Sequence, residues 1–397
     1  MSVGGVLALT KGDEMAIDPY EPQPEHRFAF ALESAVDVAA VGLTSALEER
    51  IAMLAEAGAW GINLAEGELV GPDDGPHERA QRVAAVRRSL HAAGLRVPMV
   101  KANLAVEPLF KNGAFTSHDV EVRAFAVQRA MEAVELAVEL GAEVVMLSGE
   151  REGGEPEPVK DPVMALKHTR ECVDFLTHHV LNSNYDLRFV LEARAVEPHG
   201  DMYLPNTGAV LAFIDTLDHP SLVGVSPQLP AARTSGSQMT RTVAQVFELG
   251  KLYHLDLNGQ KGSHNHHRRF GSDDIESAFY LVHFLERVGF EGPRHFHAHG
   301  FHVHGLTELR RFVQSSMRTY LILREKADRF EHDLEIQGML AELRVRDEAM
   351  GAEALVFSPS RRDRLLHAQF DRSALRSRKL TYERLDELTM ELLLGVR

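Results

Sequence analysis

The feature that most constrains the fold of this chain is an eightfold alternation between a short apolar segment and a longer helical segment. Each short segment is rich in β-branched or aromatic residues and is bounded by Gly, Pro or charged residues, which predicts a buried strand. We expect strands at Phe28–Ser34, Trp60–Glu66, Val97–Leu104, Glu143–Gly149, Arg188–Arg194, Val223–Gln228, Leu252–Asn258 and Arg294–His299. Because helical segments separate them, these strands are expected to run parallel.

The segments between the predicted strands carry apolar residues at helical spacing. In Val120–Leu140 they recur on one face, and Gly141 follows as a stop signal. Eight strand-helix units within about 300 residues predict an α/β fold, a closed (β/α)8 TIM barrel, whose active groups lie at the carboxyl ends of the strands. An open doubly wound sheet is the alternative.

The chain divides into three predicted parts. Residues 1–26 form an N-terminal arm with a Pro-rich, acidic end, and residues 27–327 form the barrel. Residues 328–397 form a C-terminal helical arm, with a break at Ser358–Ser360. The C-terminal arm has no evident core of its own, so we expect it to pack on another subunit and mediate a homo-oligomer. A tail folded back on its own barrel is the alternative.

Composition excludes several classes of protein. The formal net charge of −15 argues against a nucleic-acid partner, which requires a basic face. The single Cys172 excludes an internal disulfide framework. The apolar run Val6–Leu9 is too short for a signal-peptide core or a membrane span. We therefore expect a cytoplasmic protein with no membrane partner.

Four polar residues stand at the ends of the last four predicted strands, where their side chains can converge on one cation. They are Glu192, Gln228, Asp256 and His297. Two carboxylates, an amide oxygen and an imidazole suit Mn²⁺, Zn²⁺, Fe²⁺ or Co²⁺ better than Ca²⁺, and Mg²⁺ is a further candidate. One alternative is a site without metal, in which the ammonium of Lys101 reaches the two carboxylates and replaces the cation. The other is a disordered pocket or one without a role.

Histidines cluster after the seventh and eighth predicted strands, at 264–267 and 299–304. The two clusters could face one another at the barrel mouth and form a further metal site. The alternative is that these loop histidines have no role of their own. Three acidic residues near the first two strand ends, Glu33, Glu66 and Glu68, are candidate acid-base groups or solvated loop charges.

Seven strings of residues carry a likeness to a known family. They are Leu136–Glu143, Arg151–Gly153, His254–Gln260, Arg269–Gly271, Gly292–Phe296, Tyr320–Leu323 and Tyr382–Asp386. Together they resemble the actinobacterial-type xylose isomerases, from about Arg27 to Gly395. The resemblance implies a metal-dependent aldose-ketose isomerase fold, assembled as a tetramer through the C-terminal arm. It also implies that Glu192 and Asp256 are retained ligands of the family's structural metal.

The same resemblance implies that much of the family's site is altered. Its bridging carboxylate falls on Gln228, and its last-strand aspartate falls on His297. The ligands of its second, catalytic metal fall on Ala231 and within Asn265–His267. The ring-opening histidine falls on Ala65. The aromatic wall of the pocket falls on Glu33, Ala105 and Ser148.

A lysine that holds a substrate oxygen in the family falls on Arg194, so a positive charge persists there. Arg194 then either binds a carboxylate or phosphate of the substrate or makes a salt bridge with a carboxylate at the mouth.

Two hypotheses about function follow. The first is a divergent, non-catalytic homologue, a pseudoenzyme that keeps the oligomer and binds a sugar-like small molecule without isomerising xylose by the two-metal hydride shift. The second is an isomerase or epimerase of another polyhydroxy carbonyl compound that uses one divalent metal. In that case Lys101, Arg194 and Glu33 are the candidate catalytic residues.

Overall fold

The structure is a computed structural model. It describes residues 18–35, 46–69, 71, 74–154, 157–194, 202–227, 229, 238–261, 264–300, 303–348 and 355–397. Eight short parallel strands form the barrel: β1 (Phe28–Ala31), β2 (Gly61–Ala65), β3 (Met99–Ala102), β4 (Val144–Leu147), β5 (Arg188–Glu192), β6 (Val223–Ser226), β7 (Asp256–Leu257) and β10 (Arg294–Phe296).

The strands lie in the order β6-β5-β4-β3-β2-β1-β10-β7, and each pairs in parallel with its neighbour. A parallel bridge between Val225 and Leu252 links the two ends of this order. The predicted TIM barrel and its eight strands are confirmed, although each strand is shorter than predicted. The residues beyond the strand ends turn into the loops of the barrel mouth, where they no longer pair with a neighbouring strand.

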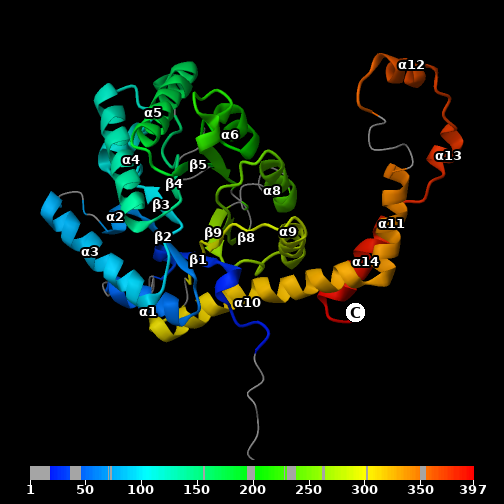
Figure 1. The fold of residues 1–397 in the computed structure, drawn as a ribbon, viewed down its shortest axis with the longest axis horizontal. Helices are drawn as coiled ribbons and strands as arrows, with labels where there is room; N and C mark the ends of the chain where they lie inside the picture. Colours follow the sequence, from blue (N-terminus) through cyan, green and yellow to red (C-terminus); the bar gives the residue numbers. More distant parts are fainter. Residues whose placement is uncertain are drawn as a thin grey trace, which may run out of the picture.

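Helices surround the barrel in Figure 1. They are α1 (Leu47–Glu56), α2 (Glu66–Leu69), α3 (Pro76–Ala93), α4 (Val120–Leu140), α5 (Pro162–Asn182), α6 (Thr207–Ile214), α8 (Met239–Glu248), α9 (Ile275–Arg287) and α10 (Gly305–His332). Short 3-10 turns are η1 (Pro24–His26), η2 (Leu32–Ala35), η3 (Pro108–Asn112), η4 (Glu157–Val159) and η5 (Pro220–Leu222).

Helix α4 has the predicted bounds. The Asp119 carboxylate accepts a hydrogen bond from the amide of Glu121 at its start, and Gly141 takes the left-handed conformation at its end, with φ of 72°. None of the described helices is both long and apolar enough to cross a membrane.

The strands bury both faces, and the two faces carry different side chains. Outward residues such as Val100, Val145 and Phe189 belong to the large core between the strands and the helices. A separate apolar cluster fills part of the barrel interior: Met99, Val144, Met146 and Val190. Because side chains alternate along a strand, the next inward residues toward the carboxyl ends are polar: Lys101, Ser148 and Glu192. The interior thus has an apolar part and, beyond it, a polar mouth.

An antiparallel hairpin, β8 (Gly259–Lys261) and β9 (His264–Arg268), follows β7. It was not predicted, because its strands carry almost no apolar residues and so lack the pattern that marks a half-buried strand. The hairpin positions His267, which lies on β9, at the barrel mouth.

The C-terminal arm continues directly from the barrel wall. Helix α10 runs through the predicted boundary at residue 328 and is followed by α11 (Leu334–Glu348), α12 (Pro359–His367), α13 (Arg372–Arg376) and α14 (Tyr382–Leu393). Helix α14 folds back on α10 and α11, and Lys326 Nζ donates to the carbonyl of Leu392 at 2.8 Å. Helices α12 and α13 bury none of their residues and lie far from the barrel (Figure 1). Only part of the tail therefore folds back on its own chain.

Candidate functional site

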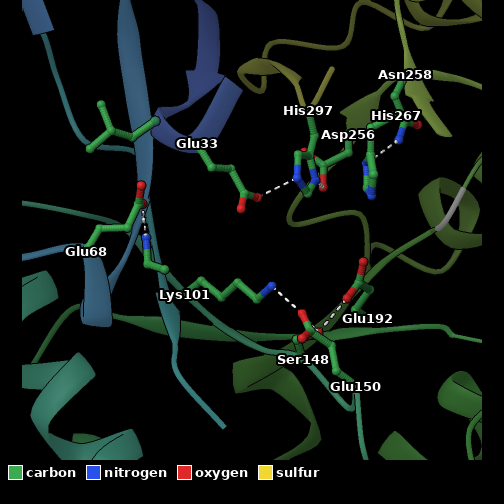
Figure 2. A network of polar contacts seen from close by, with 12 residues as sticks. Glu33, Glu68, Lys101, Ser148, Glu150, Glu192, Asp256, Asn258, His267 and His297 are labelled. Carbon is green, nitrogen blue, oxygen red and sulfur yellow. Dashed lines mark hydrogen bonds and ion pairs between the residues drawn. The ribbon is translucent and has the colours of Figure 1, made fainter. Parts of the chain in front are cut away.

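The carboxyl ends of the strands enclose a cavity of about 50 Å³, enough for a few waters or an ion. Five of the seven predicted site residues line it: Glu33, Lys101, Glu192, Asp256 and His297. Ala65, on which the sequence resemblance places the family's ring-opening histidine, lines it too. Gln228 and Ala231 lie outside the described residues. Figure 2 shows that the polar side chains of the mouth fall into two groups, one around His297 and one around Lys101.

Glu33 and His297 form a direct pair. Glu33 lies in η2 immediately after β1, and His297 follows β10; because β1 and β10 are neighbours, the two side chains meet. His297 Nε2 lies 2.5 Å from Glu33 Oε1. Burial opposes ionisation of Glu33, but the hydrogen bond and charge of His297, with the charge of Lys101, outweigh burial and lower the pKa of Glu33. Burial also opposes the charge on His297, but Glu33 and Asp256 raise its pKa.

Asp256 lies between two histidines. Its Oδ1 is 3.0 Å from His254 Nε2, and its Oδ2 is 3.9 Å from His297 Nδ1. Burial would raise the pKa of Asp256, but the two histidines, His254 first, lower it to about 2. The ring of His254 stacks on that of His295 at 4.0 Å, and His295 Nδ1 lies 2.7 Å from Asn63 Nδ2. This buried chain fixes the carboxylate of Asp256 at the edge of the cavity.

Lys101 contacts Glu150, a residue of the loop after β4. The sequence hypothesis directed its ammonium to Glu192 and Asp256, and Glu150 was not singled out. Burial opposes the charge of Lys101, but Glu150, Glu192 and Glu33 raise its pKa. Burial likewise opposes the ionisation of Glu150, but Lys101 and Arg194 lower its pKa. The position of Glu150 just beyond a predicted strand end was the available signal for its place at the mouth.

Glu192 is held by its neighbours inside the barrel. Its Oε2 accepts hydrogen bonds from Ser148 Oγ at 2.6 Å and from Arg194 Nη2 at 2.9 Å. Arg194 Nη2 also lies 3.7 Å from Glu150 Oε1. Arg194 therefore makes the salt bridge to a mouth carboxylate that was one of its two interpretations. The charge of Glu192 is balanced by a guanidinium.

Three imidazoles meet beside this network. The ring centroid of His267 lies 4.3 Å from that of His297 and 5.1 Å from that of His299. One nitrogen from each ring lies within 4.8 Å of the others, close to the spacing that a single metal ion requires. Burial, with the nearby charges of His297 and His299, lowers the pKa of His267 to about 3.

The expectation that the two histidine clusters face one another is thus confirmed for His267 and His299. The side chains of His264 and His266, and the whole of His302, lie outside the described parts of the chain.

The two remaining acidic candidates have different surroundings. Glu66 turns away from the mouth, and Arg129 Nη2 binds its two carboxylate oxygens at 2.6 and 2.8 Å. Glu68 lines the cavity, accepts a hydrogen bond from the amide of Ala65 at 2.9 Å and lies 3.6 Å from Arg50. Burial raises the pKa of Glu68.

Solved structures share this fold. A D-tagatose 3-epimerase-like protein superposes with a TM-score of 0.57 at 16% identity, over 76% of this chain and 98% of that protein. A D-psicose 3-epimerase with D-fructose gives a TM-score of 0.56 at 10% identity, over 75% and 99% of the two chains. At these identities the likeness shows the fold alone.

Sequence relatives are more similar. The xylose isomerase of Thermus thermophilus is 40% identical over 385 residues, which cover 95% of this chain and 100% of that protein. The xylose isomerase of Thermus caldophilus is 38% identical over the same shares. A family model described as a xylose isomerase-like TIM barrel matches residues 51–314. The chain belongs to the xylose isomerase-like TIM-barrel family.

Proposed function

We propose that this protein is a sugar isomerase or epimerase that moves a proton at a carbon next to a carbonyl group of a polyhydroxy compound other than xylose. Membership of the family and the fold shared with sugar epimerases support a sugar substrate. One observation carries the reaction type: two couples of a carboxylate and a cation lie at the mouth, Glu33 with His297 and Glu150 with Lys101 (Figure 2).

Two carboxylates on different sides of a substrate suit proton transfer. One, as a carboxylate, can take a proton from one face of the carbon, and the other, in its protonated form, can give its own proton to the opposite face or to the neighbouring carbon. The product is an epimer or a compound with a shifted carbonyl group, and the two carboxyl groups regain their starting states by exchange of protons with solvent. The side chain of Glu33 is 48% exposed and that of Glu150 is 22% exposed, so a substrate at the mouth can reach both. Lys101 Nζ, between the two sides, donates to the substrate oxygen on which negative charge develops.

The wall of the mouth favours proton transfer over a hydride shift. A hydride shift requires a dry apolar wall that keeps water from the developing charge. Here Glu33 and Ser148 stand at wall positions, and both form polar contacts, with His297 and with Glu192. Such a polar wall can hold and pass protons.

One divalent ion fits the histidine side of the mouth. His267 and His299 each offer a nitrogen, as does His297 once it releases the proton that Glu33 stabilises, and a carboxylate oxygen of Asp256 lies 3.9 Å from His297. This donor set matches Mn²⁺, Zn²⁺, Fe²⁺ or Co²⁺. When bound, the ion would polarise the substrate carbonyl. Glu192, a member of the ligand set predicted from sequence, would join only after Arg194 releases it.

Proton exchange tests the proposed reaction. The protein is incubated in D2O with a panel of ketopentoses and ketohexoses, with and without Mn²⁺, and the sugars are analysed by NMR. We expect deuterium at the carbon next to the carbonyl of at least one sugar, because the abstracted proton exchanges with solvent. Glu33→Gln and Glu150→Gln should each abolish the exchange. Glu121→Gln, on the exposed first turn of α4, is the control and should retain it.

The outcomes separate the alternatives. Conversion of xylose to xylulose without deuterium uptake would identify a hydride shift and contradict the proposal. Saturable sugar binding by calorimetry, with neither exchange nor conversion, would support the second candidate, a sugar-binding homologue without turnover. The ion pair between Glu192 and Arg194 favours that second candidate, because a carboxylate already held by a guanidinium is a poor metal ligand.

We also propose that the protein is a homo-oligomer, a tetramer assembled through the C-terminal arm. The support is a set of large apolar side chains exposed along the outer part of the arm: Leu355, Val356, Phe357, Leu366 and Phe370. Apolar surface of this extent on a folded chain is normally covered by a partner.

A further inference from the structure

A hollow of about 900 Å³ lies at the opposite end of the barrel from the mouth. Residues just before the first four strands line it: Arg27, Trp60, Arg96 and Glu143. Helix α3 and the end of α4 form its sides. Its volume falls in the range of small-molecule sites, about 300 to 1,000 Å³.

The hollow collects positive charge in an acidic protein. Ala84, Arg87, Arg88 and His91 line it from α3, at the i, i+3, i+4 and i+7 spacing of one helix face. With Arg27 and Arg96, four guanidinium groups line the hollow, against two carboxylates, Glu139 and Glu143. Glu139 already forms a salt bridge with Arg79, whose Nη1 lies 3.0 Å from Glu139 Oε1. The formal net charge of the chain is −15, so this surface has the opposite sign to the charge of the protein as a whole.

Several arginines of the barrel wall have a carboxylate partner, as Arg79, Arg129 and Arg310 do. Within the part of the chain that the structure describes, Arg87, Arg88 and Arg96 form no ion pair. Three unbalanced guanidinium groups around one concavity create a local positive potential that attracts anions.

Trp60 forms a fixed wall of the same hollow. The Arg27 guanidinium lies 4.9 Å from the centre of the Trp60 indole ring. Arg27 Nη1 donates a hydrogen bond to the carbonyl of Glu291 at 2.8 Å. Arg27 is thereby held in place, facing the same space as the arginines of α3. Trp60 is also the single tryptophan of the sequence, so its fluorescence reports on this site alone.

We propose that this hollow binds a small polyanion with two or more phosphate groups. Guanidinium groups bind phosphate oxygens in pairs of parallel hydrogen bonds, and several arginines around one space match several anionic groups on one ligand. A long flat basic stripe would suit nucleic acid, whereas a single open hollow on an acidic protein suits a small molecule. This site lies apart from the mouth and does not depend on the reaction proposed there.

Titration with inorganic pyrophosphate tests the proposal. Trp60 emission and calorimetric heat are followed for the full-length protein at low ionic strength. We expect a saturable change of both signals, and weaker binding as NaCl rises, because salt screens the charges. Arg87→Gln combined with Arg88→Gln should weaken binding at least tenfold. The matched control, Lys111→Gln with Lys167→Gln, removes the same charge at exposed sites elsewhere and should leave binding unchanged.

Three results would overturn the proposal. The first is the absence of both heat and emission change in the wild-type protein. The second is equal weakening in the two double variants, which would mean that total charge alone attracts the ligand. The third is a lower sedimentation coefficient of the Arg87→Gln, Arg88→Gln variant but not of the control, which would make the hollow a contact between copies of this chain.

Discussion

Arg194 Nη2 lies 2.9 Å from Glu192 Oε2 inside the barrel mouth, where both side chains are nearly buried. Opposite charges removed from water stabilise each other only while both are present, because each has lost its hydration. The guanidinium supplies positive charge beside a carboxylate that the sequence hypothesis assigned to a divalent ion. Several properties of the mouth follow from this pair.

Removal of one charge of the Arg194–Glu192 pair should destabilise the folded protein more than removal of both charges. Arg194→Gln leaves the buried Glu192 charge unbalanced, so we expect the free energy of unfolding to fall by about 3 to 5 kcal/mol. The double variant, Arg194→Gln with Glu192→Gln, should lose clearly less free energy of unfolding than the single variant. Urea denaturation measures both, and Mn²⁺ should restore part of the stability of the single variant. Additive losses in the double variant would mean that the two groups are not coupled.

The histidine side of the mouth should determine metal content. We expect His267→Ala and His299→Ala each to lower the Mn²⁺ or Zn²⁺ bound per chain at least tenfold at limiting metal, because each removes one imidazole donor. Elemental analysis after dialysis measures the content. His118→Ala, on an exposed loop, is the control. Unchanged content in both site variants would move the ligands to other residues.

Stability should depend on pH through Glu66. Burial outweighs the attraction of Arg129 and raises the pKa of Glu66 from 4.5 to about 7. Between these values the folded protein keeps a proton on Glu66 that the unfolded chain releases, so the contribution of Glu66 to stability is greatest below pH 4.5 and falls as pH rises toward 7. The Glu66→Gln variant carries no carboxyl group at this position, so its stability does not show this fall with pH. From pH 4.5 to 7, the stability of wild type relative to the variant should therefore fall by roughly 3 kcal/mol.

Urea denaturation at several pH values measures this difference, with Glu121→Gln as the control for a solvated glutamate. A difference that stays constant, or that grows in favour of the wild type with pH, would show that Arg129 keeps Glu66 ionised throughout.

Cys172 should be unreactive in the folded protein. Its side chain lies on the buried face of α5, and burial raises the pKa of its thiol to about 12. Since the thiolate is the reactive form, we expect labelling by a maleimide at pH 7.5 to be at least 100-fold slower than in urea-unfolded protein. Mass spectrometry counts the adducts. Rapid labelling of the native protein would mean that α5 opens readily.

The outer arm should control assembly. Phe357→Asp with Phe370→Asp places two charges in the proposed contact surface, and we expect a smaller particle in analytical ultracentrifugation. Val106→Asp with Val163→Asp makes the same change at exposed apolar residues of the barrel and should leave the assembly unchanged. A monomeric wild type, or equal effects of the two variants, would contradict the proposed interface.

The barrel could be predicted from sequence because its signals are local and repeated. Each strand is an apolar run with β-branched residues, and Val120–Leu140 shows a helical face followed by Gly141. The facing of His267 and His299 was also predictable, because both follow strands that neighbour each other at the carboxyl end of the barrel.

The partners of the charged groups could not be predicted in the same way. Lys101 can extend toward any of several carboxylates at the mouth, and its choice of Glu150 depends on the course of the loop after β4. Glu66 adjoins a predicted strand end, yet it turns outward to Arg129 because the chain enters α2 there. The β8–β9 hairpin lacks an apolar face, so no hydrophobic pattern marks it.

Helix α10 is one unbroken rod of about 42 Å, at 1.5 Å per residue over its 28 residues, and it starts just beyond the loop that carries His297 and His299. One of its ends is anchored beside the mouth and the other carries the arm. A partner that holds the arm in the proposed assembly would therefore limit the motion of these imidazoles, and dilution that separates the copies should weaken binding of the proposed ion at the mouth.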